Sequence, residues 1–282
     1  MGYATNNLQQ VLVYCSTPNG DDGGIWMDGD GLAVDSSTNL YFITGDGLFN
    51  TNTQDYGDSF VKMSAAGTVL DYFSPSVQSG LDASNLDLGS GGVLLLPDQG
   101  GAHPHEMVSA GKNGTIYLVD RDNMGHFSTN DSQIVQALVN VFTGGSGLTT
   151  GNFCSPIYYN GYVYFSGISD HVKAFQLSNG LLTTNATTQS SQSYGYPGGA
   201  LSISANGNTN GILWAVQRNG DSAAGSLHAY NAGNRASELY NSDQAGSRDT
   251  LDIASKFNVP LVANGKVFVS SVGQLIVYGL LP

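Results

Sequence analysis

The sequence predicts an all-β fold, and within that class a β-propeller of about five four-stranded blades. Three observations support this prediction. Short apolar segments alternate with turns rich in glycine, of which the chain has 38, and no long helical pattern interrupts them. These segments recur at intervals typical of propeller blades. Hydrophobic residues make up 40% of the 282 residues, which is enough for the core of a single domain spanning residues 1–282.

The repeat is clearest in two segments, residues 155–166 and 259–270, each of which has an apolar strand, an Asn-Gly turn and an aromatic strand. Weaker copies begin near Leu32, Met107 and Leu201. The aromatic residue of the second strand marks five units, at Tyr41, Tyr117, Tyr164, Trp214 and Phe268. Successive markers are 76, 47, 50 and 54 residues apart, and long loops enlarge the first interval. Such periods match one propeller blade each.

Outer strands and ring closure follow from the same pattern. Fourth strands are expected at residues 68–73, 134–139, 181–187 and 238–240, but the last unit reaches Pro282 after its third strand. Residues 8–14 read as an outer strand with no blade before them. We therefore expect this N-terminal strand to pair with the C-terminal blade and close the ring, because pairing would remove two open sheet edges.

The charge and composition of the chain limit the kinds of partner that it can bind and indicate its cellular location. The chain has 22 acidic and 9 basic side chains, a formal net charge of −13, so it would repel a nucleic-acid backbone. No apolar run approaches the length of a membrane helix. Only 11% of residues are charged, which favours a secreted or other extracytoplasmic protein, although residues 1–20 lack the features of a signal peptide. Cys15 and Cys154 have no spacing typical of a metal site.

Carboxylates collect on one expected face of the ring, around the mouth of the channel. On the predicted strand positions this face holds Asp28, Asp30, Asp46, Asp55, Asp58, Asp87, Arg121, Asp122, Asp170, His171, Arg218, Arg248 and Asp249. Because carboxylate oxygens favour hard cations, we expect a divalent metal, calcium, at Asp46, Asp58 and Asp249. Arg248, His171 and Tyr196 are expected to line a pocket for a small-molecule ligand. Trp26, Tyr194 and Tyr196 lie in glycine-rich loops and are candidates for binding a flat or sugar-like ligand.

Several motifs in the first half of the chain resemble a known family. They are Tyr41-Phe42-Ile43-Thr44-Gly45-Asp46-Gly47, Tyr56-Gly57-Asp58-Ser59, Asp71-Tyr72-Phe73-Ser74-Pro75, Leu86-Asp87-Leu88, Leu96-Pro97-Asp98-Gln99 and the segment from Ala110 to Arg121. In this order they resemble the pyrroloquinoline-quinone (PQQ) propellers of the methanol-dehydrogenase type, over residues 20–125. The rest of the chain resembles PQQ-type blades only generally.

The resemblance implies roles for three residues. Asp46 stands where the family places an asparagine that ligates calcium, Asp87 falls near the catalytic aspartate, and Lys112 falls where a basic side chain contacts the quinone. Two departures stand beside these matches. Gly31 stands where the family has a stacking tryptophan, and the chain has no adjacent cysteine pair. Family enzymes also have more blades, so the chain resembles a shortened and degenerate relative.

Three functions remain open at this stage. The first is a PQQ-like propeller whose acidic channel binds a divalent cation and a small ligand, acting as a binding module or as a metal-dependent hydrolase of esters, lactones or phosphoesters, with Asp87 positioning water. The second is a PQQ- and calcium-dependent alcohol or sugar dehydrogenase in which Asp87 is the base. The third is a non-catalytic scaffold, including a homodimer formed through an open blade edge.

Overall fold

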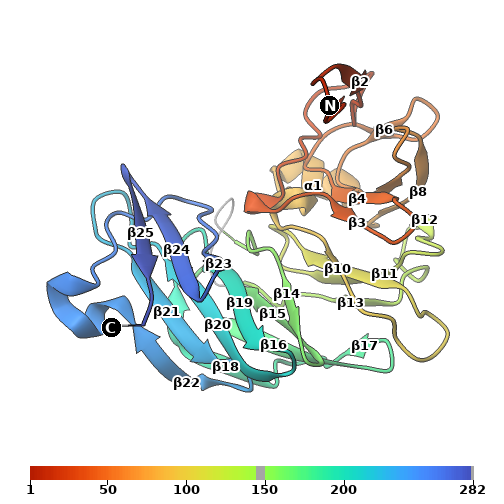
Figure 1. The fold of residues 1–282 in the computed structure, drawn as a ribbon. Helices are drawn as coiled ribbons and strands as arrows, with labels where there is room; N and C mark the ends of the chain where they lie inside the picture. Colours follow the sequence, from red (N-terminus) through yellow and green to blue (C-terminus); the bar gives the residue numbers. More distant parts are fainter. Residues whose placement is uncertain (144–149, 281–282) are drawn as a thin grey trace.

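Five β-sheets follow one another in chain order and form an arc around a common axis (Figure 1). The computed structural model describes residues 1–143 and 150–280. Within each sheet the earliest strand lies at one edge and its antiparallel neighbours follow outward. This arrangement is a β-propeller, and the predicted number of five blades is confirmed.

The first two blades occupy the N-terminal half of the chain. The strands of the first blade are β3 (Ala33–Val34), β4 (Leu40–Ile43), β7 (Phe60–Met63), β8 (Val69–Ser74) and, parallel to β8, β12 (His126–Phe127). Those of the second are β9 (Leu94–Leu95), β10 (Glu106–Ala110), β11 (Ile116–Asp120) and β13 (Gln136–Leu138). The connections contain η1 (Met27–Gly29), the hairpin of β5 (Phe49–Asn50) and β6 (Asp55–Tyr56), α1 (Gln78–Ser84) and η2 (Leu88–Ser90).

Three further blades follow. The strands of the third blade are β14 (Ile157–Tyr159), β15 (Tyr162–Ser166), β16 (Asp170–Ser178), β17 (Leu181–Leu182) and β18 (Thr188–Tyr194). Those of the fourth are β19 (Ala200–Asn206), β20 (Thr209–Gln217), β21 (Ser226–Asn231) and β22 (Asn234–Asn241), followed by η4 (Ser242–Arg248). The fifth contains β23 (Leu261–Ala263), β24 (Lys266–Ser271) and β25 (Gln274–Tyr278). The fifth sheet therefore has three strands in the part of the chain that is described.

The outer strand of the third blade differs from the prediction. It was expected at residues 181–187, but the strand that pairs along most of β16 is β18, and β17 forms only a short pairing. Tyr194, predicted to lie in a loop, ends this strand and is fully buried. Its hydroxyl oxygen lies 2.9 Å from that of Tyr230 in the next blade. Tyr194 is therefore a packing residue between blades.

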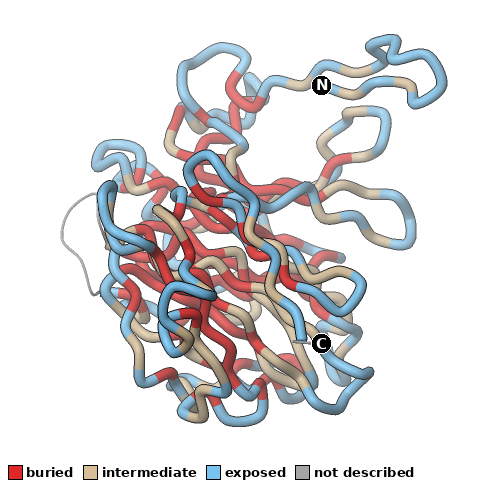
Figure 2. Tube along the Cα trace, turned by 60° about the vertical axis from the view of Figure 1, so that its left-hand side comes forward, coloured by how far each residue is buried: buried red, intermediate tan, exposed pale blue. Residues whose placement is uncertain are grey.

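The hydrophobic core lies between neighbouring blades, where the faces of successive sheets pack together. Of the five aromatic residues that mark the repeat, Tyr41, Tyr117 and Tyr164 are buried, whereas Trp214 and Phe268 are partly exposed. The strand of Tyr117 differs from the prediction: β9 is the innermost strand of the second blade, so Tyr117 on β11 lies on the third strand and not on the second. Figure 2 shows buried residues through the sheets and exposed residues in the connecting turns. No helix in the described ranges is long and apolar enough to cross a membrane.

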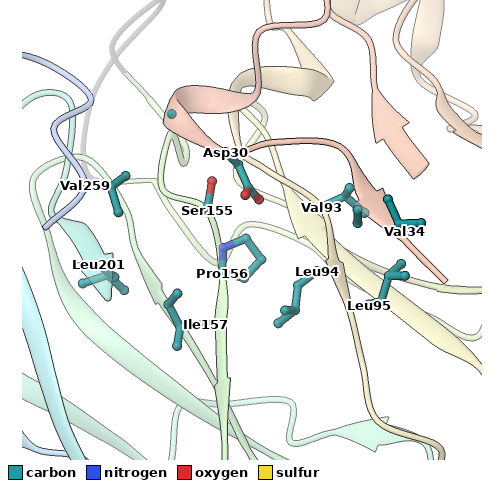
Figure 3. A pocket seen from close by; sticks show the side chains of 12 residues that line it. Asp30, Val34, Val93, Leu94, Leu95, Ser155, Pro156, Ile157, Leu201 and Val259 are labelled. Atoms are coloured by element: carbon teal, nitrogen blue, oxygen red, sulfur yellow. The ribbon is translucent and has the colours of Figure 1, made fainter. Parts of the chain in front are cut away.

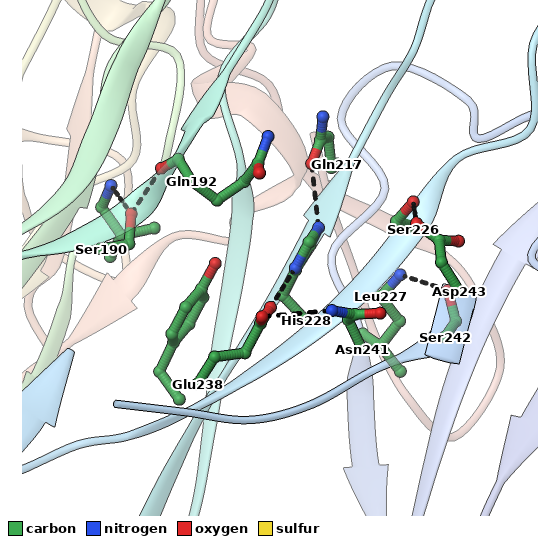
Figure 4. A network of polar contacts seen from close by, with 12 residues as sticks. Ser190, Gln192, Gln217, Ser226, Leu227, His228, Glu238, Asn241, Ser242 and Asp243 are labelled. Carbon is green, nitrogen blue, oxygen red and sulfur yellow. Dashed lines mark hydrogen bonds and ion pairs between the residues drawn. The ribbon is translucent and has the colours of Figure 1, made fainter. Parts of the chain in front are cut away.

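A polar network ties the fourth blade together (Figure 4). His228 on β21 is buried, its Nδ1 lies 2.6 Å from Glu238 Oε1 on β22, and its Nε2 lies 2.9 Å from Gln217 Oε1 on β20. Both ring nitrogens are thus hydrogen-bonded to neighbouring strands. Because buried polar groups stabilise a fold only when they are paired, this network fixes the register of three strands.

The expected ring closure is absent from the described residues. The N-terminal segment forms its own hairpin, in which β1 (Gly2–Tyr3) pairs with β2 (Gln10–Leu12), and this hairpin projects from the body (Figures 1 and 2). The first and fifth blades meet near the axis through side chains, with the rings of Trp26 and Phe257 6.0 Å apart. A local hairpin needs only a short loop to close, whereas the expected pairing joins opposite ends of the chain.

Replacing Val11 with serine is expected to change the free energy of unfolding by less than about 0.5 kcal/mol. The side chain of Val11 is 67% exposed, so the substitution removes almost no packing. Denaturant unfolding measures the effect, with Val61→Ser in the buried first blade as the control that loses several times more. A loss at Val11 as large as that at Val61 would mean that the hairpin pairs with the body in solution.

Candidate functional site

Three residues singled out by the sequence, Asp46, Asp87 and Lys112, meet where the loop that leads to the innermost strand of the second blade lies beside two connections between second and third strands. Asp46 follows β4, Asp87 precedes η2, and Lys112 follows β10. The Lys112 ammonium forms an ion pair with Asp87 Oδ2 and donates a hydrogen bond of 3.1 Å to Asn85 Oδ1. Asp87 Oδ1 accepts hydrogen bonds from the Asp46 amide at 3.2 Å and from Trp26 Nε1 at 3.4 Å. Asp87 is therefore the centre of the cluster.

Two glycines allow these loops to approach so closely. A Cβ atom on Gly45 would collide with Asp87 Oδ1 and lie 3.3 Å from Trp26 Nε1. A Cβ atom on Gly111 would lie 2.8 Å from the Asp87 carbonyl oxygen. Glycine is required at both positions because another backbone or a polar side chain occupies the space of a side chain.

The carboxyls of Asp46 and Asp87 lie close enough together to shift each other's pKa in opposite directions. A hydrogen bond to Asp87, together with burial, raises the pKa of Asp46 to about 7. Burial alone would raise the pKa of Asp87, but hydrogen bonds from Asp46 and Lys112 hold it below its usual range. Two carboxylates in contact do not both ionise easily, so the proton resides on Asp46 and the negative charge on Asp87. The pair can both donate and accept a hydrogen bond near neutral pH.

Asp58 lies directly behind this pair and is fully buried. Its Oδ1 accepts a hydrogen bond of 2.9 Å from the Leu88 amide, whereas its Oδ2 has no partner among the described residues. Burial raises the pKa of Asp58 to about 8. Its position supports the loop that carries Asp87, and it is too deeply buried to contact a ligand.

Aromatic rings form a wall beside the charged cluster. The Lys112 ammonium lies 5.8 Å from the ring centres of both Trp26 and Phe153. The Trp26 and Phe153 rings are 5.7 Å apart, and Phe257 contacts both at 6.0 Å. Tyr196 extends the wall, with its ring 5.7 Å from Phe153. Trp26, Phe257 and Tyr196 are partly exposed, so the wall faces solvent.

A strained turn presents this wall. Met27 and Asp28 are consecutive non-glycine residues with φ of 34° and 32°, in the left-handed region that costs about 1 kcal/mol or more for ordinary side chains. Asp28 is buried, its Oδ1 has no partner among the described residues, and burial raises its pKa to about 8. Such strain is typical of segments shaped by function as well as by packing.

The remaining candidate residues lie outside this cluster. Asp249 pairs with Arg248, at 2.6 Å from Nε to Oδ1, and accepts a 2.7 Å hydrogen bond from the Tyr240 hydroxyl. His171 lies on β16, with Nδ1 3.1 Å from the Gln192 carbonyl oxygen. No contact in the described part of the chain links these side chains to Asp87. Of the three expected pocket residues, the structure brings only Tyr196 to the site.

Phe153 and Phe257 are functional-site residues that were not predicted from the sequence. Both lie four residues before the innermost strand of their blade, and Tyr196 has the same place before β19. An aromatic residue at this position in three successive blades is a periodic signal. A comparison of the loops, rather than of the strands, would have found it.

The donor set does not fit the calcium ion expected from the resemblance. Among the described residues no group of three or more histidine, cysteine, aspartate or glutamate side chains converges as metal ligands require, and Asp249 is not beside Asp46 and Asp58. The oxygens of Asp87 are already engaged by Lys112, Trp26 and Asp46.

Comparison with solved structures shows the fold. The chain is similar to the quinohemoprotein alcohol dehydrogenase from Comamonas testosteroni, with 13% identity and a TM-score of 0.50, covering 88% of this chain and 44% of that one. It is equally similar to quinohemoprotein alcohol dehydrogenase ADHIIG from Pseudomonas putida HK5, with 14% identity, a TM-score of 0.51 and the same coverage. BamB from Moraxella catarrhalis matches with 15% identity and a TM-score of 0.42, over 92% of this chain and 76% of that one.

The chain therefore spans less than half the length of either dehydrogenase. At such identities the likeness shows a PQQ-like β-propeller fold and nothing finer. No family model matches the sequence, and no curated protein matches it.

Proposed function

We propose that this end of the propeller binds a small polyhydroxylated ligand, a sugar or polyol, at Trp26, Asp46 and Asp87. The observation that carries the proposal is the place of Asp87, whose Oδ1 accepts from the Asp46 amide and from the indole of the partly exposed Trp26, with the Asp46 carboxyl, whose pKa is raised to about 7, beside it. This pair presents an O–H donor and carboxylate acceptors at one point, which matches a hydroxyl group that both donates and accepts. The indole face offers an apolar surface for the C–H face of a sugar ring.

The comparisons agree with a hydroxyl-bearing ligand, because the two similar dehydrogenases are named for alcohols. The low content of charged residues, 11%, supports a place outside the cytoplasm. Metal-dependent hydrolysis is not part of the proposal, since the carboxylates do not assemble as metal ligands in the described ranges.

A PQQ- and calcium-dependent dehydrogenase is the second candidate. It is favoured by one observation: Asp87 and Lys112, the residues at the expected base and quinone-contact positions, form an ion pair. The oxygens of Asp87, already engaged by Lys112, Trp26 and Asp46, count against it. A non-catalytic scaffold needs none of these groups.

Fluorescence of a single tryptophan tests the proposal. The chain has two tryptophans, so Trp214→Phe leaves Trp26 as the reporter at the site. Titration with D-glucose or myo-inositol is expected to change the Trp26 emission and to saturate. Asp46→Ala in the same background is expected to weaken binding about tenfold, because it removes a hydrogen bond to a partly ionised pair. The Trp26→Phe variant, which reports through Trp214, should show no change.

Two other results of these titrations would contradict the proposal. PQQ with calcium that quenches Trp26 and saturates, while glucose and inositol give no signal, would replace the proposal with the cofactor-dependent dehydrogenase. No saturable change with any of these probes would leave the scaffold function.

A further inference from the structure

The centre of the propeller contains a separate cavity, beside the innermost strands. It has a volume of about 340 Å³ and receives residues from all five blades (Figure 3). Its wall is largely aliphatic: the main contributors are Val34, Val93, Leu95, Ile157, Leu201 and Val259. None of the Trp26, Asp46, Asp87 and Lys112 side chains lines it. The volume is in the range of cavities that hold small molecules.

One end of this cavity is polar. Asp30 and Ser155 point toward each other there, above the aliphatic walls (Figure 3). Gly92 lies beneath them, and a Cβ atom on it would collide with both Asp30 Oδ2 and Ser155 Oγ. The two oxygens therefore converge at one point. Their convergence depends on the missing side chain at Gly92.

The polar end lacks a counter-charge. Asp30 forms no ion pair in the described part of the chain, and no lysine or arginine lines the cavity there. Its Oδ1 accepts a 2.9 Å hydrogen bond from the Gly31 amide, and the Ser155 Oγ atom is buried beside the carboxylate. Desolvation raises the pKa of Asp30, and hydrogen bonds from the Gly31 amide and the Ser155 hydroxyl counter this shift. The carboxylate and the oxygen of the Ser155 hydroxyl keep lone pairs that can accept from another donor.

From this arrangement we propose that the cavity binds a short primary alkylammonium ion. The three N–H donors of the ammonium group match the Asp30 carboxylate and the Ser155 hydroxyl. The alkyl chain would lie along Val34, Leu95 and Ile157, where water is displaced from aliphatic side chains. The net charge of −13 attracts cations to the molecule in general, and the apolar walls select those with a hydrocarbon tail.

Calorimetric titration with ethyl-, butyl- and hexylammonium chloride at pH 7.5 tests the site. Affinity is expected to rise about fourfold for each added methylene, because one buried CH₂ contributes about 0.8 kcal/mol. Asp30→Asn is expected to weaken hexylammonium binding at least about tenfold. Asp98→Asn, which removes an equally negative side chain that does not line the cavity, should leave the affinity unchanged. Asp46→Ala should also leave it unchanged, which separates this site from the proposed sugar site.

Two results would overturn the proposal. Hexan-1-ol binding as tightly as hexylammonium would show that the charge of Asp30 is not recognised. Equal affinities across the three amines would show only surface ion pairing. Val34→Phe provides a second variant if Asp30→Asn folds poorly, because Val34 is 55% exposed and a larger side chain there fills the cavity without disturbing the core. Unchanged hexylammonium binding by that variant would also contradict the proposal.

Discussion

Replacing Lys112 with methionine is expected to lower the free energy of unfolding by about 3 kcal/mol at pH 7. The side chains of Lys112 and Asp87 are 11% and 9% exposed, so the substitution leaves a nearly buried carboxylate without its cation. Removing one partner of a buried ion pair is far more damaging than removing both, because the remaining charge stays desolvated. Asp87→Asn is expected to have a similar effect by stranding the lysine.

A double-mutant cycle provides the measurement. Unfolding in urea gives the free energies of the two single variants and of Asp87→Asn combined with Lys112→Met. The double variant is expected to lose much less than the sum of the two single losses. Arg248→Met is the control, since Arg248 is 54% exposed and a solvent-exposed ion pair such as Arg248 with Asp249 contributes little to stability. If the free-energy losses of the two single variants add up to the loss of the double variant, Lys112 and Asp87 do not interact.

Local signals made the fold predictable. The two clearest repeats contain the turns Asn160-Gly161 and Asn264-Gly265, and all four residues have positive φ. The angles are 48° for Asn160 and 82° for Gly161, and 51° for Asn264 and 71° for Gly265. These angles suit the tight hairpin turns that asparagine followed by glycine favours. Because the turn geometry is set by the turn residues themselves, the strand pairs on either side followed from the sequence.

The elements that were missed depend on distant contacts. The outer strand of the third blade, Thr188–Tyr194, is polar apart from its last residue and shows no apolar alternation. It forms because β16 offers an unpaired edge, a condition that the local sequence does not contain. The same reason applies to ring closure. Residues 8–14 carry a strand pattern, but the pattern does not specify which edge the strand meets.

The charged part of the site was predicted and its aromatic part was not. Asp46, Asp87 and Lys112 were recognised by resemblance, and they do meet. Phe153 and Phe257 lie in loops, where neither strand periodicity nor a family motif marks them. The pairing of Asp249 with Arg248 instead of a metal follows from their adjacency in sequence, which favours a local ion pair. Carboxylates can be counted from a sequence, but their convergence requires the fold.

Stability is expected to fall as the pH rises from 5 to 9, and Asp58→Asn is expected to remove the part of this loss that comes from Asp58, roughly 1.4 kcal/mol for each pH unit up to about pH 8. Burial raises the folded-state pKa of Asp58 to about 8, from an ordinary value of 3.8. Below the lower value both states are protonated and folding is unaffected. Between the two values the folded state must take up a proton that the unfolded state has lost, so stability decreases until the pH passes the folded pKa.

Asparagine suits this position, since it keeps the acceptor for the Leu88 amide and tolerates the φ of 46°. The advantage of Asp58→Asn in urea unfolding should therefore grow between pH 5.5 and 8.5. Asp55→Asn is the matched control. Burial alone would raise the pKa of Asp55, but hydrogen bonds from Thr53 and Asn19 hold it below its usual range, so this variant should be destabilised at the same pH values. An Asp58→Asn advantage that is independent of pH would show that the carboxyl is already ionised in the folded protein, and the stability of the Asp87 loop would then need another explanation.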